Sequence, residues 1–118
     1  MNNATSATPS TRTIGCTLTN ENGIWKILDN TLHDNIGCST VSQTSDNIRV
    51  NYTSPFDAVV TSSVTVDNDF NSYEVFAGAS VGTNYILISL YDSGNRINPN
   101  QITYRYANIS IVVIGNDY

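Results

Sequence analysis

Charged side chains are scarce in this sequence, and their scarcity narrows the classes of function it can have. Only 13% of the 118 residues are charged, against a typical share of about 25%. Positive charge is scarcest, with one lysine, Lys26, and four dispersed arginines in a chain of net charge −5. A nucleic-acid-binding protein needs a basic face to neutralise phosphates, and an anionic membrane attracts basic segments. We therefore expect neither nucleic acid nor a membrane as a partner.

Long apolar runs and an export signal are also lacking. No apolar run approaches the ~18 residues of a membrane span. The N-terminal residues lack the basic start and apolar middle of a signal peptide. We expect synthesis without a signal peptide and release by lysis, as for a virus or a spore, into an extracellular surface assembly. A cytosolic protein, a mature form and an unusual export route also agree with this N-terminus.

Complete catalytic and metal-binding signatures are absent as well. His33 with Asp29 and Asp34 offers acid–base groups, but no Gly-x-Ser-x-Gly turn supplies a nucleophile. Asp67 and Asp69 offer oxygen ligands, but the glycine and distal glutamate of a calcium loop are missing. Ordinary hydrogen bonding in loops and turns explains these residues better. We predict no enzyme, no cofactor and no metal site.

The two cysteines, Cys16 and Cys38, each follow an Ile-Gly pair. Two free buried thiols are the slightly preferred interpretation. A disulfide within or between chains is the alternative, and an extracellular location would permit it. A zinc site is disfavoured, because two cysteines and the single histidine fall short of four ligands at finger spacing.

The residues that are abundant favour strands and turns. Ile48, Val50 and Tyr52 alternate with polar residues, as in a half-buried strand. Similar patterns predict strands at residues 14–18, 24–28, 47–53, 58–66, 73–82, 84–91 and within 101–115, with 39–45 uncertain. No segment has a helical period. Seven or eight short strands predict an all-β antiparallel sandwich, jelly-roll-like in arrangement.

The C-terminal run is the strongest of these strands. Ile109, Ile111 and Val113 share one face, and Val112 and Ile114 share the other. Apolar residues on both faces predict a strand that is covered on both sides. We expect it to lie centrally, with one face in the core and part of the run near a subunit interface.

The N-terminal residues 1–13 are predicted to be a flexible arm, and residues 14–118 a single domain. The arm is rich in Asn, Ser, Thr and Ala and has no apolar periodicity. It is either a disordered terminus or a connector that becomes ordered on a neighbouring subunit. As a connector, its linking residues would be Met1, Asn2, Asn3, Ala4 and Thr5.

The aromatic residues offer two interpretations. Trp25, Tyr104 and Tyr106 are candidates for a subunit interface or for stacking on a glycan. Packing in the core or at an interface is the preferred interpretation, since tyrosines also serve as ordinary cross-strand pairs.

Several short motifs together resemble a known kind of domain. In chain order they are Ile-Trp at 24–25, Asp29 and His33, Ser-Gln-Thr at 42–44, Ile-Arg-Val-Asn-Tyr at 48–52, Val-Thr-Val-Asp at 64–67 and Gly-Ala-Ser-Val-Gly at 78–82. In this order they resemble small β-domains of structural and fibre proteins of phages of Gram-positive bacteria, and of Bacillus-type surface fibres. The resemblance covers about residues 23–90 and implies a β-sandwich that forms oligomers, often trimers. It implies no catalytic residues.

These observations lead to two expectations for function. The first is a self-assembling structural subunit of an extracellular fibre, appendage or virion, whose main partners are copies of itself in a trimer or filament. The second is a module of a phage tail or surface fibre that binds a cell-surface glycan or receptor. Low charge supports the first expectation, because subunits can bury surface against one another without burying many ions.

Overall fold

A computed structural model describes residues 10–28, 36–67, 75–102 and 108–118. These residues form nine strands and one 3-10 helix. The elements in chain order are β1 (Ser10–Glu21), β2 (Ile24–Ile27), β3 (Cys38–Gln43), β4 (Ile48–Tyr52), β5 (Ala58–Val66), β6 (Val75–Val81), β7 (Tyr85–Asp92), β8 (Asn95–Ile97), η1 (Pro99–Gln101) and β9 (Asn108–Asp117).

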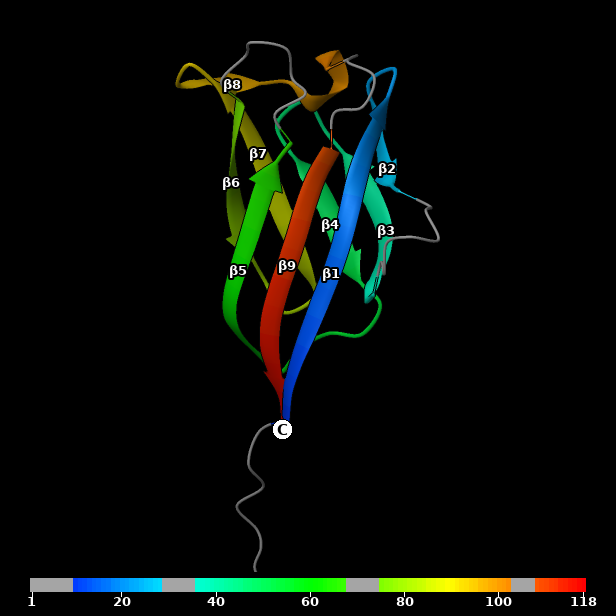
Figure 1. Cartoon of the computed structure of the whole chain (residues 1–118), viewed down its shortest axis with the longest axis vertical. Helices are drawn as coiled ribbons and strands as arrows, with labels where there is room; N and C mark the ends of the chain where they lie inside the picture. Colours follow the sequence, from blue (N-terminus) through cyan, green and yellow to red (C-terminus); the bar gives the residue numbers. More distant parts are fainter. Residues whose placement is uncertain (1–9, 29–35, 68–74, 103–107) are drawn as a thin grey trace, which may run out of the picture.

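The strands form two antiparallel sheets. Sheet A has the order β2-β1-β9-β5, and sheet B has the order β3-β4-β7-β6 with β8 beside β7. In Figure 1, β5, β9 and β1 form the front layer, and β6, β7 and β4 lie behind them. The prediction of an all-β antiparallel sandwich is therefore confirmed.

The core lies between the two sheets because each long strand alternates buried and less buried residues. The period of two places every second side chain on the inner face. The fully buried aliphatic residues are Ile14, Leu18, Ile48, Val50, Ile86, Ile88, Leu90, Ile109, Ile111 and Val113. The predicted inner face of β4, with Ile48, Val50 and Tyr52, belongs to this cluster.

Two tight turns set the register of their hairpins. Asn22 and Gly23 have φ angles of 54° and 88° and connect β1 to β2. Ser93 and Gly94 have φ angles of 51° and 85° and connect β7 to β8. Two consecutive residues with positive φ match the right-handed twist of the paired strands, and Asn and Gly adopt this conformation most readily.

The strand prediction misses one element. None of the predicted strands covers residues 92–100, whereas β8 pairs with β7 there through Leu90–Ile97, Tyr91–Arg96 and Asp92–Asn95. Three residues are too few to show an alternating pattern, so the strand depends on the hairpin turn before it. The described residues consequently hold nine strands, against the predicted seven or eight.

The predicted boundary between arm and domain also needs correction. Strand β1 begins at Ser10, and residues 10–13 pair with residues 114–117 of β9. This part has no apolar alternation, but it completes the hydrogen-bonded ladder along the whole of β9. Residues 1–9, including the predicted linking residues Met1 to Thr5, lie outside the described residues.

Strand β9 lies between β1 and β5, as predicted for a central strand. Its residues Ile109, Ile111 and Val113 face the core, with exposed fractions of 0%, 1% and 0%. Val112 on the other face is 41% exposed. The described residues thus leave the face with Val112 partly exposed, whereas the sequence predicted a strand that is covered on both sides.

Candidate functional site

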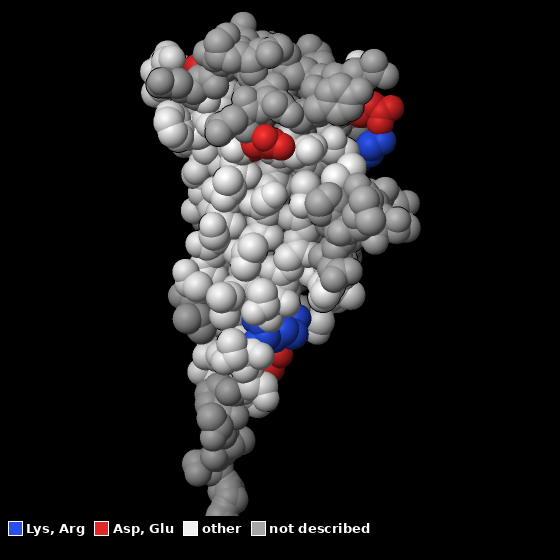
Figure 2. Space-filling model, viewed as in Figure 1, with Lys and Arg blue, Asp and Glu red and all other residues white. Residues whose placement is uncertain are grey.

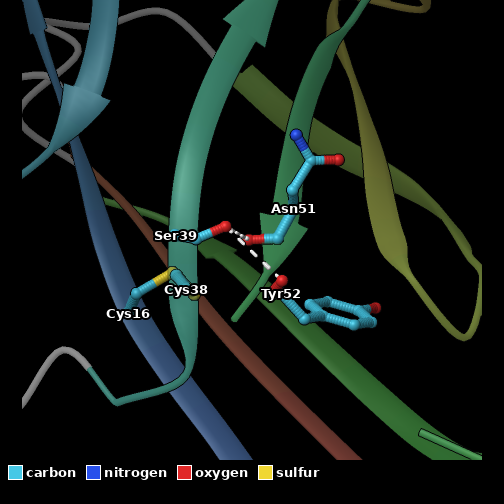
Figure 3. Close-up of a disulfide and its surroundings, with 5 residues drawn as sticks. All are labelled: Cys16, Cys38, Ser39, Asn51 and Tyr52. Carbon is cyan, nitrogen blue, oxygen red and sulfur yellow. Dashed lines mark hydrogen bonds between the residues drawn. A yellow bond between two sulfur atoms is a disulfide. The ribbon is translucent and has the colours of Figure 1, made fainter. Parts of the chain in front are cut away.

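A disulfide connects the two sheets. Cys16 lies in β1 of sheet A and Cys38 begins β3 of sheet B, and their Cα atoms are 6.4 Å apart (Figure 3). The slight preference for two free thiols was therefore wrong, because the fold brings together two cysteines that are 22 residues apart. The sequence offered only their matching Ile-Gly-Cys context as a signal.

The chain before Cys38 is held against β1. Gly15 N donates to Ile36 O at 3.0 Å, and Ile36 N donates to Gly15 O at 2.7 Å. Gly37 then has a φ of +89°, and a Cβ there would lie 2.9 Å from two carbon atoms of Ile14. After Cys38, the Ser39 hydroxyl donates to the Asn51 and Tyr52 carbonyl oxygens at 3.2 and 3.4 Å (Figure 3). Both cysteines thus sit on backbone that is fixed by neighbouring strands.

Trp25 belongs to the core and not to a binding surface. Its side chain is 3% exposed, and its Nε1 donates to the Pro99 carbonyl oxygen at 3.1 Å. Trp25 faces inward because its cross-strand partner is Asn20, which is also buried. A ring in this position cannot stack on a glycan, so that candidate role is corrected. Tyr104 and Tyr106 lie outside the described residues.

Among the residues that the structure describes, the outer face of sheet A carries no charged side chain along its middle. We use the name sheet A face for its outward residues Thr13, Thr17, Thr61, Ser63, Thr65, Ser110, Val112 and Ile114. The strand registers place these residues in rows, such as Thr13, Ile114 and Thr61 on β1, β9 and β5. Figure 2 shows this surface in the uncharged colour, with charged atoms gathered toward its ends and one side.

The outer face of sheet B has a different character. Phe76 and Tyr91 are cross-strand partners on β6 and β7, and Arg96 of β8 is the partner of Tyr91 on its other side. Farther along β7, the guanidinium carbon of Arg49 lies 3.9 Å from the centre of the Tyr85 ring. An open hollow of about 300 Å³ lies on this face, lined by residues of β6 and β7 and by Asn47, which directly precedes β4. This aromatic face was not predicted, because it depends on strand registers that the sequence does not display.

The described residues contain no group of three or more His, Cys, Asp or Glu side chains that could hold a metal ion. His33, Asp29, Asp34 and Asp69, which were weighed as acid–base or calcium-binding groups, lie outside those residues. No helix in the described part of the chain is long and apolar enough to cross a membrane.

Comparison with known proteins supplies no relative from which a function could be transferred. No family model matches the chain, and searches of curated proteins and of solved structures find no match. The surfaces of this fold are therefore the features from which we infer function.

Proposed function

We propose that the chain is a structural, non-catalytic subunit that assembles with copies of itself into an extracellular fibre, appendage or virion. The observation that carries this proposal is the uncharged sheet A face on a chain of net charge −5. Two copies that meet at this face bury no like charges there, whereas burying an unpaired charge is costly. Val112, which is 41% exposed, supplies aliphatic contact at the centre of the face.

The hydroxyl groups of the sheet A face suit a contact between copies. Thr and Ser side chains both donate and accept hydrogen bonds. They can therefore pair with the same residue types on a second copy, in any of several relative orientations. We propose a trimer, as the resemblance to phage and surface-fibre domains implies, and a jelly-roll-like arrangement, as the strand pattern of the sequence implies.

The N-terminal arm is proposed to link neighbouring subunits. The first residue of β1, Ser10, is the partner of Asp117 near the C-terminus. Residues 1–9 therefore connect to the sheet at the end where β9 also finishes. An extended arm can add a strand to a neighbour's sheet, and this mode of binding depends on main-chain hydrogen bonds.

The disulfide supports the proposed location. Disulfides persist in oxidising surroundings and are rare in reducing ones. A bond between Cys16 and Cys38 thus agrees with a protein that works on a virion or cell surface.

Oligomer mass tests the proposal. We expect the wild-type chain to sediment as a homo-oligomer and Val112→Lys to sediment as a folded monomer. Phe76→Lys is the matched control, because Phe76 is 64% exposed on the opposite sheet. It should fold and assemble like the wild type. A monomeric wild type at high concentration, or a Val112→Lys variant that still assembles, would contradict the proposed contact.

The linking role of the arm has its own test. Deletion of residues 1–9 should leave the domain folded and stop growth beyond the smallest oligomer. Unchanged higher-order assembly after the deletion would contradict a linking role of the arm. It would not contradict assembly through the sheet A face.

A further inference from the structure

The hollow on the outer face of sheet B exists because small residues meet between larger ones. Gly78 of β6 is the cross-strand partner of Ser89 of β7, and both line the hollow. Tyr91 and Leu87, two residues away from Ser89 on either side along β7, line it as well. Alternate residues of a strand point to the same face, so an aromatic ring and an aliphatic side chain flank a shallow floor.

The ring of Tyr91 is held in place by its neighbours. A Cβ on Gly78 would lie 3.3 Å from Tyr91 Cε2, so the ring lies close over the glycine. On the other side, the Arg96 guanidinium carbon is 5.9 Å from the ring centre. A hydrogen bond with Arg96 lowers the pKa of the Tyr91 hydroxyl. The exposed ring of Phe76, its partner on β6, extends the aromatic surface.

The polar groups of the hollow are uncharged. Asn47, Ser80 and Ser89 line it, and no Asp, Glu, Lys or Arg is among its lining residues in the described part of the chain. A carboxamide and two hydroxyls offer donors and acceptors of hydrogen bonds but no charge to pair with an ion. The chemistry of the lining therefore favours a neutral ligand that is rich in hydroxyl groups.

A sugar ring has an apolar surface and a polar surface, and each is complementary to a part of this lining. Its axial C–H groups form an apolar patch that fits the negative face of an aromatic ring. Its equatorial hydroxyls can bond to the surrounding serine and asparagine groups. The volume of about 300 Å³ lies at the lower end of the range for small-ligand sites. It suits one or two sugar units at a time.

We propose that this hollow is a binding site for a neutral saccharide, held between Tyr91 and Leu87 and hydrogen-bonded by Asn47, Ser80 and Ser89. The site lies on the sheet opposite to the sheet A face, so an assembled subunit would still present it. The inference is independent of self-assembly, and either can fail without the other. It also replaces Trp25 as the aromatic group of a glycan site.

Binding of defined saccharides tests the site. The probes are maltohexaose, cellohexaose and N-acetylchitohexaose, each titrated into the full chain and followed by saturation-transfer NMR. We expect at least one to bind with a Kd of about 1 mM or below, as for a small open site with few contacts. Tyr91→Ala should weaken that binding about tenfold or more, whereas Tyr91→Phe, which keeps the ring, should retain it within about threefold.

Gly78→Val provides a second test, because it fills the hollow and displaces the Tyr91 ring. Valine suits a strand, so we expect a folded protein with unchanged Trp25 fluorescence and binding reduced about tenfold or more. Tyr118→Ala is the control, since Tyr118 is 74% exposed and does not line the hollow. Binding of none of the three saccharides, or binding that survives both Tyr91→Ala and Gly78→Val, would overturn the proposal.

Discussion

Arg12 and Asp117 form a two-point ion pair across β1 and β9, at the end of sheet A where β1 begins and β9 finishes. Arg12 Nε lies 2.8 Å from Asp117 Oδ2, and Nη2 lies 3.1 Å from Oδ1. The same guanidinium donates to the carbonyl oxygens of Ser54 and Pro55 at 3.0 and 2.8 Å. It also stands 4.3 Å from the centre of the Phe56 ring. One side chain thus joins both strands to the loop between β4 and β5.

Replacing Arg12 with lysine tests this junction. An ammonium group cannot make the two-point contact and reach both carbonyl oxygens, so Arg12→Lys should lower the free energy of unfolding. Urea denaturation at neutral pH measures the change. Arg96→Lys is the matched control, because Arg96 hydrogen-bonds the Tyr91 hydroxyl but forms no ion pair among the described residues. Equal effects of the two substitutions would contradict a special role for Arg12.

Acid should weaken the same junction. The hydrogen bond from Arg12 holds the pKa of Asp117 below its ordinary value. Because the folded-state pKa lies below the unfolded-state one, the stabilisation is present above the unfolded pKa and is lost as pH falls through the folded pKa. Asp117→Asn should therefore reduce stability at neutral pH and make little difference at about pH 2. Parallel pH profiles for the two proteins, from urea midpoints, would contradict this expectation.

The disulfide should contribute more to stability than any single ion pair. It closes a loop of 22 residues, for which the chain-entropy model gives about 3 kcal/mol. The double variant Cys16→Ala/Cys38→Ala should lose about this amount in a denaturation experiment. A reducing agent should lower the stability of the wild type to a similar extent and leave the variant unchanged. A variant as stable as the oxidised wild type would show that the disulfide contributes little to the stability of the fold.

The sequence alone was sufficient to predict those features that depend on residues close together in the chain. Alternation at Ile48, Val50 and Tyr52 predicted the inner face of β4, and all three are buried. The turn between the predicted strands at 14–18 and 24–28 has a local cause too, because Asn22 and Gly23 both have positive φ, which these residue types tolerate. Such patterns extend over a few residues and can therefore be recognised in the sequence.

The remaining features depend on residues that are far apart in the chain. Core packing, a subunit interface and glycan stacking were all open for Trp25, because its hydrogen-bond partner Pro99 lies 74 residues away. Arg12 and Asp117 are 105 residues apart. The hollow on sheet B requires Gly78 to lie beside Tyr91, and only the register of β6 against β7 places it there. Local sequence patterns do not show which of these distant residues come into contact. The aromatic face was therefore not predicted.

Gly115 should be hard to replace because Phe56 lies against it. A Cβ at Gly115 would overlap the Phe56 ring and approach the Ala58 carbonyl oxygen at 2.7 Å. Gly115→Ala should therefore cost about 1–3 kcal/mol of unfolding free energy through overpacking. Gly15→Ala is the matched control within the same sheet, since its Cβ would meet only the Ile111 carbonyl oxygen at 3.8 Å.

A double variant distinguishes overpacking from a general loss of backbone freedom. Phe56→Leu removes part of the ring that Gly115→Ala would strike, so the two substitutions together should cost less than the sum of their separate effects. Additive costs would show that contact with Phe56 is not the cause. A Gly15→Ala variant as unstable as Gly115→Ala would lead to the same conclusion.

Tyr52 should make the fold sensitive to alkali. Its hydroxyl is buried without a hydrogen-bond partner among the described residues, and burial raises its pKa from 10.0 to about 12. A raised folded-state pKa means that the stabilisation is complete below the unfolded pKa of about 10 and is lost as pH rises toward about 12. Tyr52→Phe keeps the ring, which lies edge-on to Phe56 with centres 5.5 Å apart. It removes only the ionising group.

We therefore expect Tyr52→Phe to match or slightly exceed the wild type in stability at about pH 8, because the lost hydroxyl had no partner. At about pH 11 the variant should be clearly the more stable protein. Urea midpoints at the two pH values measure the difference, and phenolate absorbance should show one fewer late-titrating tyrosine. Tyr118→Phe, at a residue that is 74% exposed, is the control. An equal loss of stability in the wild type and in Tyr52→Phe between the two pH values would contradict the assignment of alkaline sensitivity to Tyr52.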